Sequence, residues 1–228
     1  MGLLTQLVCL RADFVRRVPA GLIGKLTPLQ ELRIRCLGQD GTVQFVKELR
    51  LLRELRVLQA TIHHVRISES IESALLESLG CLHNIQELEI LAYYSPNKGW
   101  VSSDAGRVSC RHLRVLRLHC LVFSALPAWI NSSLAPNLCY LDLLVVAVED
   151  QDMETLAKLP ELSCLILHSK GDTKSVVSIK IRNEGVGYFR KLRFLKIFGP
   201  SLCFDLRGSK CNSSRAASNT IMPSLESL

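Results

Sequence analysis

One short pattern of apolar and polar positions recurs along the chain: an apolar residue, two variable residues, an apolar residue, one variable residue and a third apolar residue. The second and third apolar positions stand two residues apart. In an extended strand both side chains would therefore point to one face, and the residue between them to the other. One copy cannot bury its own apolar row, whereas stacked copies form a continuous core. The pattern predicts a parallel sheet with one strand per copy.

The copies begin at irregular intervals of 23 to 33 residues. We place them at 29–34, 52–57, 85–90, 113–118, 138–143, 162–167 and 192–197, with a weaker opening copy at Leu4, Leu7 and Cys9 and a shortened closing copy at Leu225 and Leu228. Self-similarity at such periods is typical of repeat proteins. The series predicts a single irregular repeat domain over 1–228, with about eight repeats plus a truncated ninth.

Between the copies, the apolar spacing widens to three or four residues, which predicts short helices around 45–49, 75–82 and 153–159 on the outer side of the sheet. Three further stretches are longer than a repeat needs, at 93–111, 168–189 and 199–223. The first and third are rich in Ser, Gly, Asn and charge, so we expect exposed loops there. The second stretch has partly alternating apolar residues, which favour an extra strand: Val176, Val177, Ile179 and Ile181.

Longer phrases carry a resemblance to a known family. They are Val18-Pro-Ala-Gly-Leu-Ile-Gly-Lys-Leu-Thr-Pro-Leu-Gln-Glu-Leu32, Leu126-Pro-Ala-Trp-Ile130 and Phe189-Arg-Lys-Leu-Arg-Phe-Leu195. The repeated pattern resembles the L-x-x-L-x-L core of leucine-rich repeats, and the chain is similar to a fragment of a plant, grass-type nucleotide-binding leucine-rich-repeat disease resistance protein. The resemblance implies an α/β fold, a horseshoe-like leucine-rich-repeat solenoid. Its concave face would be a parallel β-sheet, and its convex face short helices and irregular loops.

Two features depart from that family. The regular repeat continues to an Asn or Cys three residues after its last apolar position, and no copy here has either residue at that place, so we expect an uneven coil. The receptors also carry a phosphate-binding loop of the form G-x-x-x-x-G-K-[ST] ahead of their repeats. Gly24-Lys25 is the nearest approach, but Leu26 replaces the hydroxyl residue and Pro19 the first Gly. We expect neither a nucleotide-binding nor a coiled-coil domain in this chain.

Composition narrows the class of protein further. The 228 residues carry 28 Lys plus Arg against 21 Asp plus Glu, a net charge of +7, and 48% of them are hydrophobic, which excludes a disordered chain. The longest apolar run is 143–148, well short of the about 20 residues that cross a bilayer, so we expect no membrane contact. Nine Cys without a C-x-x-C pair, and no secretory signal, indicate reduced thiols in the cytoplasm, with the nucleus as a second location.

The sequence predicts no catalytic or metal-binding group. Its six His residues are scattered through different repeats, and none has a Cys or a carboxylate at ligand spacing along the chain. The cysteines lack a positioned base that would activate them. We therefore expect a protein that is not an enzyme and that uses no metal and no cofactor.

The outward positions of the predicted strands form a candidate contact surface. Equivalent side chains on neighbouring strands would lie about 4.8 Å apart in rows. Basic residues prevail in these rows, with Glu87, Glu89 and Asp142 interrupting them. Such a face is either a solvated surface or a docking surface for another protein, because Arg and aromatic side chains dominate interface energetics. The residues predicted to contact a partner are Arg33, Arg35, Arg56, Arg117, His119, Tyr140, Phe194, Lys196 and Phe198.

The resemblance also implies a function, that of the protein-recognition and autoregulatory repeat module of an intracellular plant immune receptor. Its partners would be a protein ligand, either a pathogen effector or a host protein, and the nucleotide-binding domain of the same receptor. Two alternatives stay open: a leucine-rich-repeat substrate receptor of a ubiquitin ligase, which shares the architecture, and an inactive truncated fragment. Nucleic-acid binding is disfavoured, because it rests only on the net charge of +7 and a broken basic row.

Overall fold

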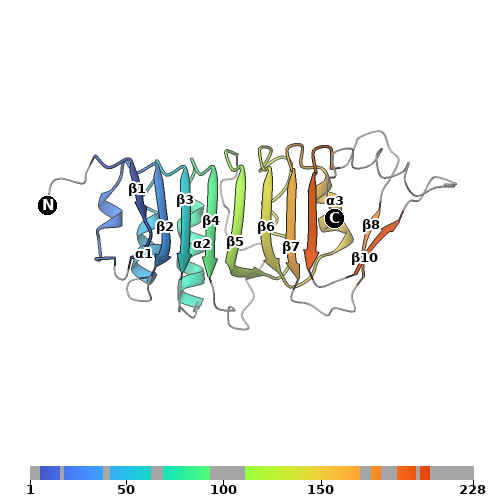
Figure 1. Cartoon of the computed structure of the whole chain (residues 1–228), viewed down its shortest axis with the longest axis horizontal. Coiled ribbons are helices and arrows are strands. Elements are labelled where there is room, and N and C mark those ends of the chain that lie inside the picture. Colours follow the sequence, from blue (N-terminus) through green and yellow to red (C-terminus); the bar gives the residue numbers. More distant parts are fainter. Residues whose placement is uncertain are drawn as a thin grey trace.

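The computed structural model describes residues 6–15, 18–37, 42–62, 69–92, 111–169, 176–180, 189–198 and 201–205. Its main element is an eight-stranded sheet in the order β1-β2-β3-β4-β5-β6-β7-β9, with every neighbouring pair parallel. The strands are β1 (Cys9–Ala12), β2 (Glu31–Leu37), β3 (Val57–Ile62), β4 (Glu87–Ala92), β5 (Val115–Phe123), β6 (Tyr140–Val145), β7 (Cys164–Ser169) and β9 (Phe194–Phe198). Figure 1 shows them side by side in chain order, which confirms the predicted solenoid with one strand per repeat.

The helices lie on one side of this sheet (Figure 1). They are the 3-10 helix η1 (Ile23–Lys25) and the α-helices α1 (Thr42–Leu49), α2 (Glu69–Cys81) and α3 (Asp150–Ala157). Each predicted helical stretch falls on one of the α-helices, although Leu82 and the residues after Ala157 lie just beyond the helix ends. Among the described residues, no helix combines the length and the apolar character that crossing a membrane requires.

The core lies between the sheet and the helices. One Leu from each strand points into it, and from β2 onward these leucines are at most 1% exposed: Leu32, Leu58, Leu88, Leu116, Leu141, Leu165 and Leu195. Phe45, Leu75 and Leu156 close the core from the helix side and are equally buried. Each buried Leu contributes roughly 1.5 to 3 kcal/mol to folding, so the stacked row is the main stabilising element of the solenoid.

A repeated hydrogen-bond joint fixes each coil on the one before it. The carbonyl of Gln30 accepts the backbone N–H groups of Arg56 and Val57 at 2.8 and 3.0 Å. The same double acceptance recurs at the start of the following strands, on the carbonyls of Arg56, Gln86, Arg114, Cys139 and Ser163. Asn84 and Asn137 add side-chain bonds to carbonyls of the preceding coil, at 3.1 and 2.7 Å. These joints hold the strands in register at the edge where they begin.

The register corrects two of the predicted copies. Leu58 pairs with Leu32 on one side and with Leu88 on the other, so the third copy runs over 55–60 and not over 52–57. Leu10 pairs with Leu32, which moves the first copy by the same three residues, to 7–12. The prediction was wrong because apolar residues recur every third position in both places. Leu52, Leu55 and Leu58 are all fully buried, and the pattern fits them in either frame.

Two irregularities interrupt the pairing of the main sheet. The register shifts between Ile34 and Leu37 on β2, and again between Leu118 and Val122 on β5. The second shift places His119 at the beginning of an irregular stretch of β5. Strand pairing in the main sheet is thus irregular at these two places.

A separate two-stranded parallel sheet lies beyond the main one. It consists of β8 (Val176–Lys180) and β10 (Ser201–Asp205), and β8 packs beside α3. The predicted extra strand is confirmed in β8. The prediction of an exposed loop over 199–223 is wrong for 201–205, where a short apolar run pairs with β8. The shortened closing copy at Leu225 and almost all of the stretch 93–111 lie outside the described residues.

Candidate functional site

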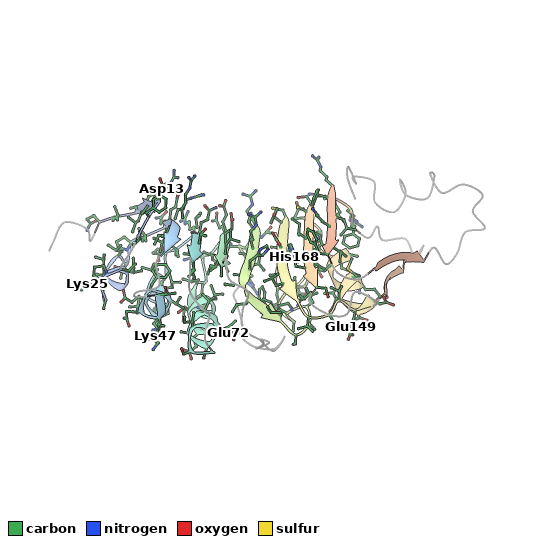
Figure 2. All side chains as sticks on the ribbon, turned by 60° about the horizontal axis from the view of Figure 1, so that its bottom comes forward. Asp13, Lys25, Lys47, Glu72, Glu149 and His168 are labelled. Carbon is green, nitrogen blue, oxygen red and sulfur yellow. The ribbon has the colours of Figure 1, made fainter. Side chains whose placement is uncertain are left out.

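The candidate site is the sheet face opposite the helices, here called the open face. Figure 2 shows Lys47 and Glu72 on the helix side of the sheet and Asp13 on the other side. Strand pairing orders the outward side chains of the open face into three rows. The first row is Cys9, Glu31, Val57, Glu87, Val115, Tyr140, Cys164 and Phe194, and the second is Arg11, Arg33, Gln59, Glu89, Arg117, Asp142, Ile166 and Lys196. Two positions further along the chain come the residues that we call the third row, in which pairing joins Thr61 with Leu91 and Leu144 with His168 and Phe198. Its members are Asp13, Arg35, Thr61, Leu91, His119, Leu144, His168 and Phe198.

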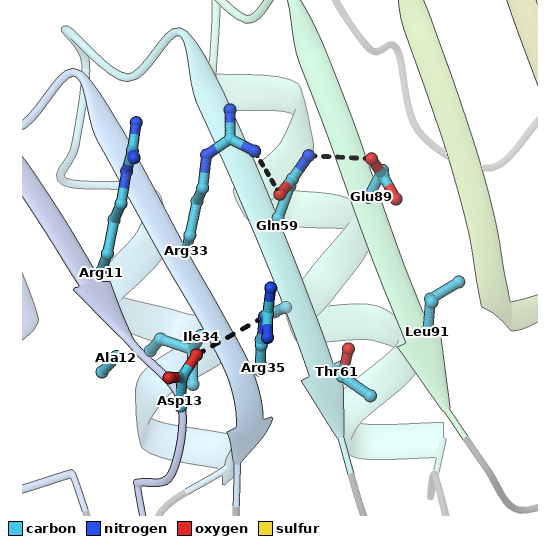
Figure 3. Close-up of a pocket in the computed structure, with 11 residues that line it drawn as sticks. Arg11, Ala12, Asp13, Arg33, Ile34, Arg35, Gln59, Thr61, Glu89 and Leu91 are labelled. Carbon is cyan, nitrogen blue, oxygen red and sulfur yellow. Dashed lines mark hydrogen bonds and ion pairs between the residues drawn. The ribbon is translucent and has the colours of Figure 1, made fainter.

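A chain of polar contacts crosses the four strands from β2 to β5, and we call it the charge ladder. Arg33 Nε lies 2.6 Å from Glu31 Oε1, and its Nη1 donates to Gln59 Oε1 at 2.5 Å. Gln59 Nε2 donates to Glu89 Oε1 at 2.8 Å, as Figure 3 shows. Arg117 Nη1 completes the ladder with a 3.2 Å contact to Glu89 Oε2. Each side chain thus bridges to the next strand, and the arginines of the ladder already have acidic partners.

The N-terminal end of the open face holds a shallow hollow of about 300 Å³. Arg11, Asp13, Arg35 and Thr61 are among the residues that line it (Figure 3). Arg11 Nε lies 2.6 Å from Glu31 Oε1, and this hydrogen bond outweighs burial and holds the pKa of Glu31 below its ordinary value. Arg35 Nε lies 3.4 Å from Asp13 Oδ1, but both side chains are largely exposed, so water weakens this pair.

Arg117 connects the charge ladder to the aromatic half of the face. Its guanidinium lies 4.9 Å from the centroid of the Tyr140 ring, and its Nη2 donates to the Tyr140 hydroxyl. Burial alone would lower the pKa of Arg117, but Tyr140, Glu89 and Asp142 reverse that effect and raise it. Burial raises the pKa of Tyr140, with Arg117 opposing it. Tyr140 is therefore a neutral phenol, and Arg117 a fixed cation, at neutral pH.

Three side chains on successive strands form a cluster that we call the His–Asp cluster. Asp142 Oδ1 lies 2.6 Å from His119 Nε2 and 3.4 Å from His168 Nε2, while Asp142 Oδ2 lies 3.2 Å from Arg117 Nε. Asp142 is only 4% exposed, whereas both imidazoles are partly open to solvent. Burial lowers the pKa of His168 despite the nearby carboxylate of Asp142, so its imidazole is neutral at neutral pH. The three ligand atoms all lie within 4.8 Å of one another.

Aromatic stacking extends the cluster to the last strand of the main sheet. The rings of His119 and His168 meet edge to face at 4.9 Å between centroids, and His168 stacks on Phe198 at 4.4 Å. Lys196 Nζ lies 4.6 Å from the centroid of the Phe198 ring. Phe198 nevertheless remains 41% exposed, so this end of the open face presents apolar surface beside a cation.

The structure places eight of the nine predicted contact residues on the open face: Arg33, Arg35, Arg117, His119, Tyr140, Phe194, Lys196 and Phe198. Arg56 is the exception. It precedes β3, its side chain is exposed, and its carbonyl belongs to the backbone joint. The corrected register puts Gln59 in the row position that Arg56 was expected to occupy.

The sequence prediction missed the His–Asp cluster. His119, Asp142 and His168 are one repeat apart along the chain, and only the pairing of β5, β6 and β7 brings them together. The absence of a carboxylate near these His residues in the sequence was therefore the wrong criterion. The aligned outward positions held the signal, because Asp142 lies on the strand between those of His119 and His168, two positions before them in the repeat.

Thiol chemistry finds no support in the described part of the chain. Among the cysteines whose side chains the structure describes, Cys9, Cys81, Cys120, Cys139 and Cys164 are free. Burial raises the pKa of Cys120 to about 12 and also raises the pKa of Cys164, so neither forms a thiolate readily.

Two comparisons with known proteins found a similarity. A family model described as "Leucine-rich repeat region" matches residues 1–228. Among solved structures, the chain is similar to a leucine-rich-repeat protein of Leptospira interrogans, with 15% sequence identity and a TM-score of 0.35 over 80% of this chain and 52% of that one. The chain thus spans about half the length of that protein. Among curated proteins, none matches this chain.

Proposed function

Because the chain belongs to the leucine-rich-repeat family, we propose that it is the protein-recognition and autoregulatory repeat module of an intracellular plant immune receptor. Leucine-rich repeats typically serve as non-catalytic scaffolds that bind other proteins. The plant receptor, the cytoplasmic location and the immune role are the finer part of the proposal, and they rest on the sequence phrases that resemble grass-type receptors. The partners would be a pathogen effector or host protein and the receptor's own nucleotide-binding domain.

The observation that carries the proposal is the composition of the open face. Its eight strands span about 34 Å at a strand spacing of about 4.8 Å, long enough to engage a folded domain. One end holds a network of arginines and carboxylates, and the other an exposed Phe198 beside Lys196. Arg and aromatic side chains supply most of the binding energy at protein interfaces, whereas a face that only keeps a protein soluble needs no exposed Phe.

Autoregulation would follow from two ligands that compete for one face. If the nucleotide-binding domain and an external protein both dock on the open face, binding of the second releases the first. The change in the fraction of chains that hold each ligand is set by the difference between the two affinities. The charge ladder and the end of the open face around Phe198 would then contact different parts of each partner.

The first test is the coding sequence that precedes Met1 in the gene. A nucleotide-binding module there supports the proposal. A pair of F-box helices there would replace it with the substrate receptor of a ubiquitin ligase.

The second test measures binding between the chain and that nucleotide-binding module, supplied as separate purified proteins. We expect the double variant Lys196→Glu with Phe198→Ala to weaken binding about ten-fold or more, because it removes the exposed aromatic anchor and its neighbouring cation. The matched control is Lys47→Glu with Phe14→Ala, which changes the same residue types on α1 and after β1. Equal affinities for the wild-type chain and the first variant would remove this end of the face from the site.

A further inference from the structure

We propose that the His–Asp cluster of His119, Asp142 and His168 is a binding site for a divalent transition-metal ion of the zinc class. The three residues come from β5, β6 and β7, which are consecutive neighbours in the main sheet. They meet on the open face, and Figure 2 labels His168, which lies on the strand next to the last of the main sheet. The inference is independent of the proposed function, because it concerns the chemistry of these three side chains and not the identity of a partner.

The distances between the ligand atoms suit one shared ion. Four-coordinate zinc with bonds of about 2.0 to 2.1 Å separates neighbouring ligand atoms by about 3.3 Å. Asp142 Oδ1 and His168 Nε2 already lie 3.4 Å apart. Asp142 Oδ1 and His119 Nε2 lie 2.6 Å apart, so this pair has to open by roughly 0.7 Å. All three atoms lie within 4.8 Å of one another, so we expect rotation of the side chains to bring them into one coordination shell.

The donor set selects the class of metal. Two imidazoles and one carboxylate are ligands that zinc, copper, nickel and cobalt share. Calcium and magnesium prefer shells of oxygen ligands, and this cluster offers a single carboxylate. Both imidazoles are partly exposed, at 26% and 28% of their side-chain surface, so an ion can enter from solvent and a water molecule can fill a fourth position.

The surroundings hold the ligands in place. Phe198 stacks on the His168 ring at 4.4 Å between centroids, and the rings of His119 and His168 meet edge to face. Both imidazoles are therefore oriented before an ion arrives. Arg117 Nε lies 3.2 Å from Asp142 Oδ2 as an ion-pair contact without a hydrogen bond, while Oδ1 faces the two imidazoles, which favours a one-oxygen contact with the metal. Such neighbours typically change metal affinity by roughly 10- to 100-fold.

Two cations oppose the binding of a metal and set its strength. Arg117 lies directly against Asp142, and Lys196 lies close enough to affect His168. Glu89 offsets part of this charge through its 3.2 Å contact with Arg117. We therefore expect an affinity below that of a closed structural zinc site with four protein ligands.

The competing arrangement is a hydrogen-bond cluster in which both imidazoles donate to Asp142 Oδ1. It uses the same atoms, and the 2.6 Å between Asp142 Oδ1 and His119 Nε2 suits a hydrogen bond as it stands, so a metal titration separates the two. In the metal site, the Nε2 lone pairs point toward the ion. In the hydrogen-bond cluster, the Nε2 hydrogens point toward the carboxylate.

The test is a titration of the full 228-residue chain with Co²⁺, followed by displacement with Zn²⁺. Tetrahedral or five-coordinate Co²⁺ absorbs strongly in visible light, and Co²⁺ bound to thiolate absorbs in the near ultraviolet. This second signal identifies binding to the cysteines. We expect one Co²⁺ per chain bound without the thiolate band and displaced by Zn²⁺. We also expect Zn²⁺ to raise the melting temperature of the wild-type chain.

The test variants are His119→Ala, His168→Ala and Asp142→Asn, and the last keeps the shape of the side chain. Each should weaken Co²⁺ binding about 100-fold and abolish the Zn²⁺ effect on melting. The matched control is His83→Ala with His112→Ala, which removes two exposed imidazoles elsewhere. Visible Co²⁺ absorption that is absent from the wild-type chain, or equal in the cluster variants, would show a hydrogen-bond cluster only and overturn the proposal. Melting curves without metal report whether each variant folds.

Discussion

Glu48 is a buried carboxylate on the helix side of the sheet, only 4% exposed, and it joins η1 to α1. Its Oε1 accepts the N–H of Gly21 at 2.5 Å and the side-chain amide of Gln44 at 2.7 Å, and its Oε2 accepts the N–H of Gly24 at 3.0 Å. Burial alone would raise the pKa of Glu48, but the hydrogen bonds from Gly24, Gln44 and Gly21 outweigh it and lower the pKa. The ionised carboxylate therefore stabilises this part of the fold.

We expect Glu48→Gln to lower the free energy of unfolding by about 1 to 3 kcal/mol at pH 7, because an amide NH₂ would face backbone donors that need an acceptor. The pKa of Glu48 is lower in the folded than in the unfolded chain, so its contribution is complete above the unfolded pKa and is lost as the pH falls through the folded pKa. The difference between wild type and variant should thus shrink below about pH 4. Urea unfolding of both proteins at several pH values measures it, and a difference that stays constant with pH would contradict this role.

At the scale of one strand, Gln59 is the β3 member of the charge ladder, and the corrected frame of the third copy places it there. It receives a hydrogen bond from Arg33 and donates one to Glu89, so it bridges β2 and β4 through β3. The neutral amide of Gln59 accepts a hydrogen bond from the Arg33 cation and donates one to the Glu89 anion, so it links the two without adding a charge. Arg56 stands only three residues earlier but lies outside the rows.

We expect Gln59→Ala to cost about 1 kcal/mol of unfolding free energy, because it removes two side-chain hydrogen bonds from partly buried groups. Arg56→Ala, which leaves the backbone joint intact, should change stability by less than about 0.5 kcal/mol. Thermal or urea unfolding of the two variants measures this contrast. If the copy over 52–57 were the true one, Arg56 would stand in the ladder and the two costs would be reversed.

These elements show how far the sequence determines the structure. The repeated Leu pattern predicts the number and order of the strands, since the spacing of two within each copy has one simple structural meaning. The same pattern left the frame of the third copy open, because Leu52, Leu55 and Leu58 are all buried. Only the pairing of Leu58 with Leu32 and Leu88 decides it.

The site was less predictable than the fold. Eight contact candidates reach the open face because alternation along a strand fixes which side each residue takes. Which of them touch depends on the register between strands, and that is why the contacts of Asp142 with His119 and His168 escaped prediction. Strand β10 also escaped prediction, because it pairs with β8 in a separate sheet and not with a strand of the main sheet.

At the scale of the whole molecule, the charge of the open face differs from that of the chain. The chain carries a net charge of +7. The three rows hold as many carboxylates as cationic side chains: Arg11, Arg33, Arg35, Arg117 and Lys196 against Asp13, Glu31, Glu87, Glu89 and Asp142. The expected prevalence of basic residues on this face was wrong, because the corrected register exchanges Arg56 for Arg11 and adds Asp13, and Glu31 and Glu87 lie in the first row. The excess positive charge therefore lies elsewhere in the sequence.

This distribution predicts weak binding to nucleic acid. A phosphate backbone is bound by cations that release its counterions, and Arg33 and Arg117 are already neutralised by Glu31, Glu87, Glu89 and Asp142. We expect fluorescence anisotropy with a labelled DNA duplex to show no binding tighter than about 10⁻⁶ M at physiological salt. We also expect Arg33→Ala to leave any low-salt binding unchanged. A salt slope that falls by about one unit in that variant would place Arg33 on phosphate, and the open face would then be a nucleic-acid surface.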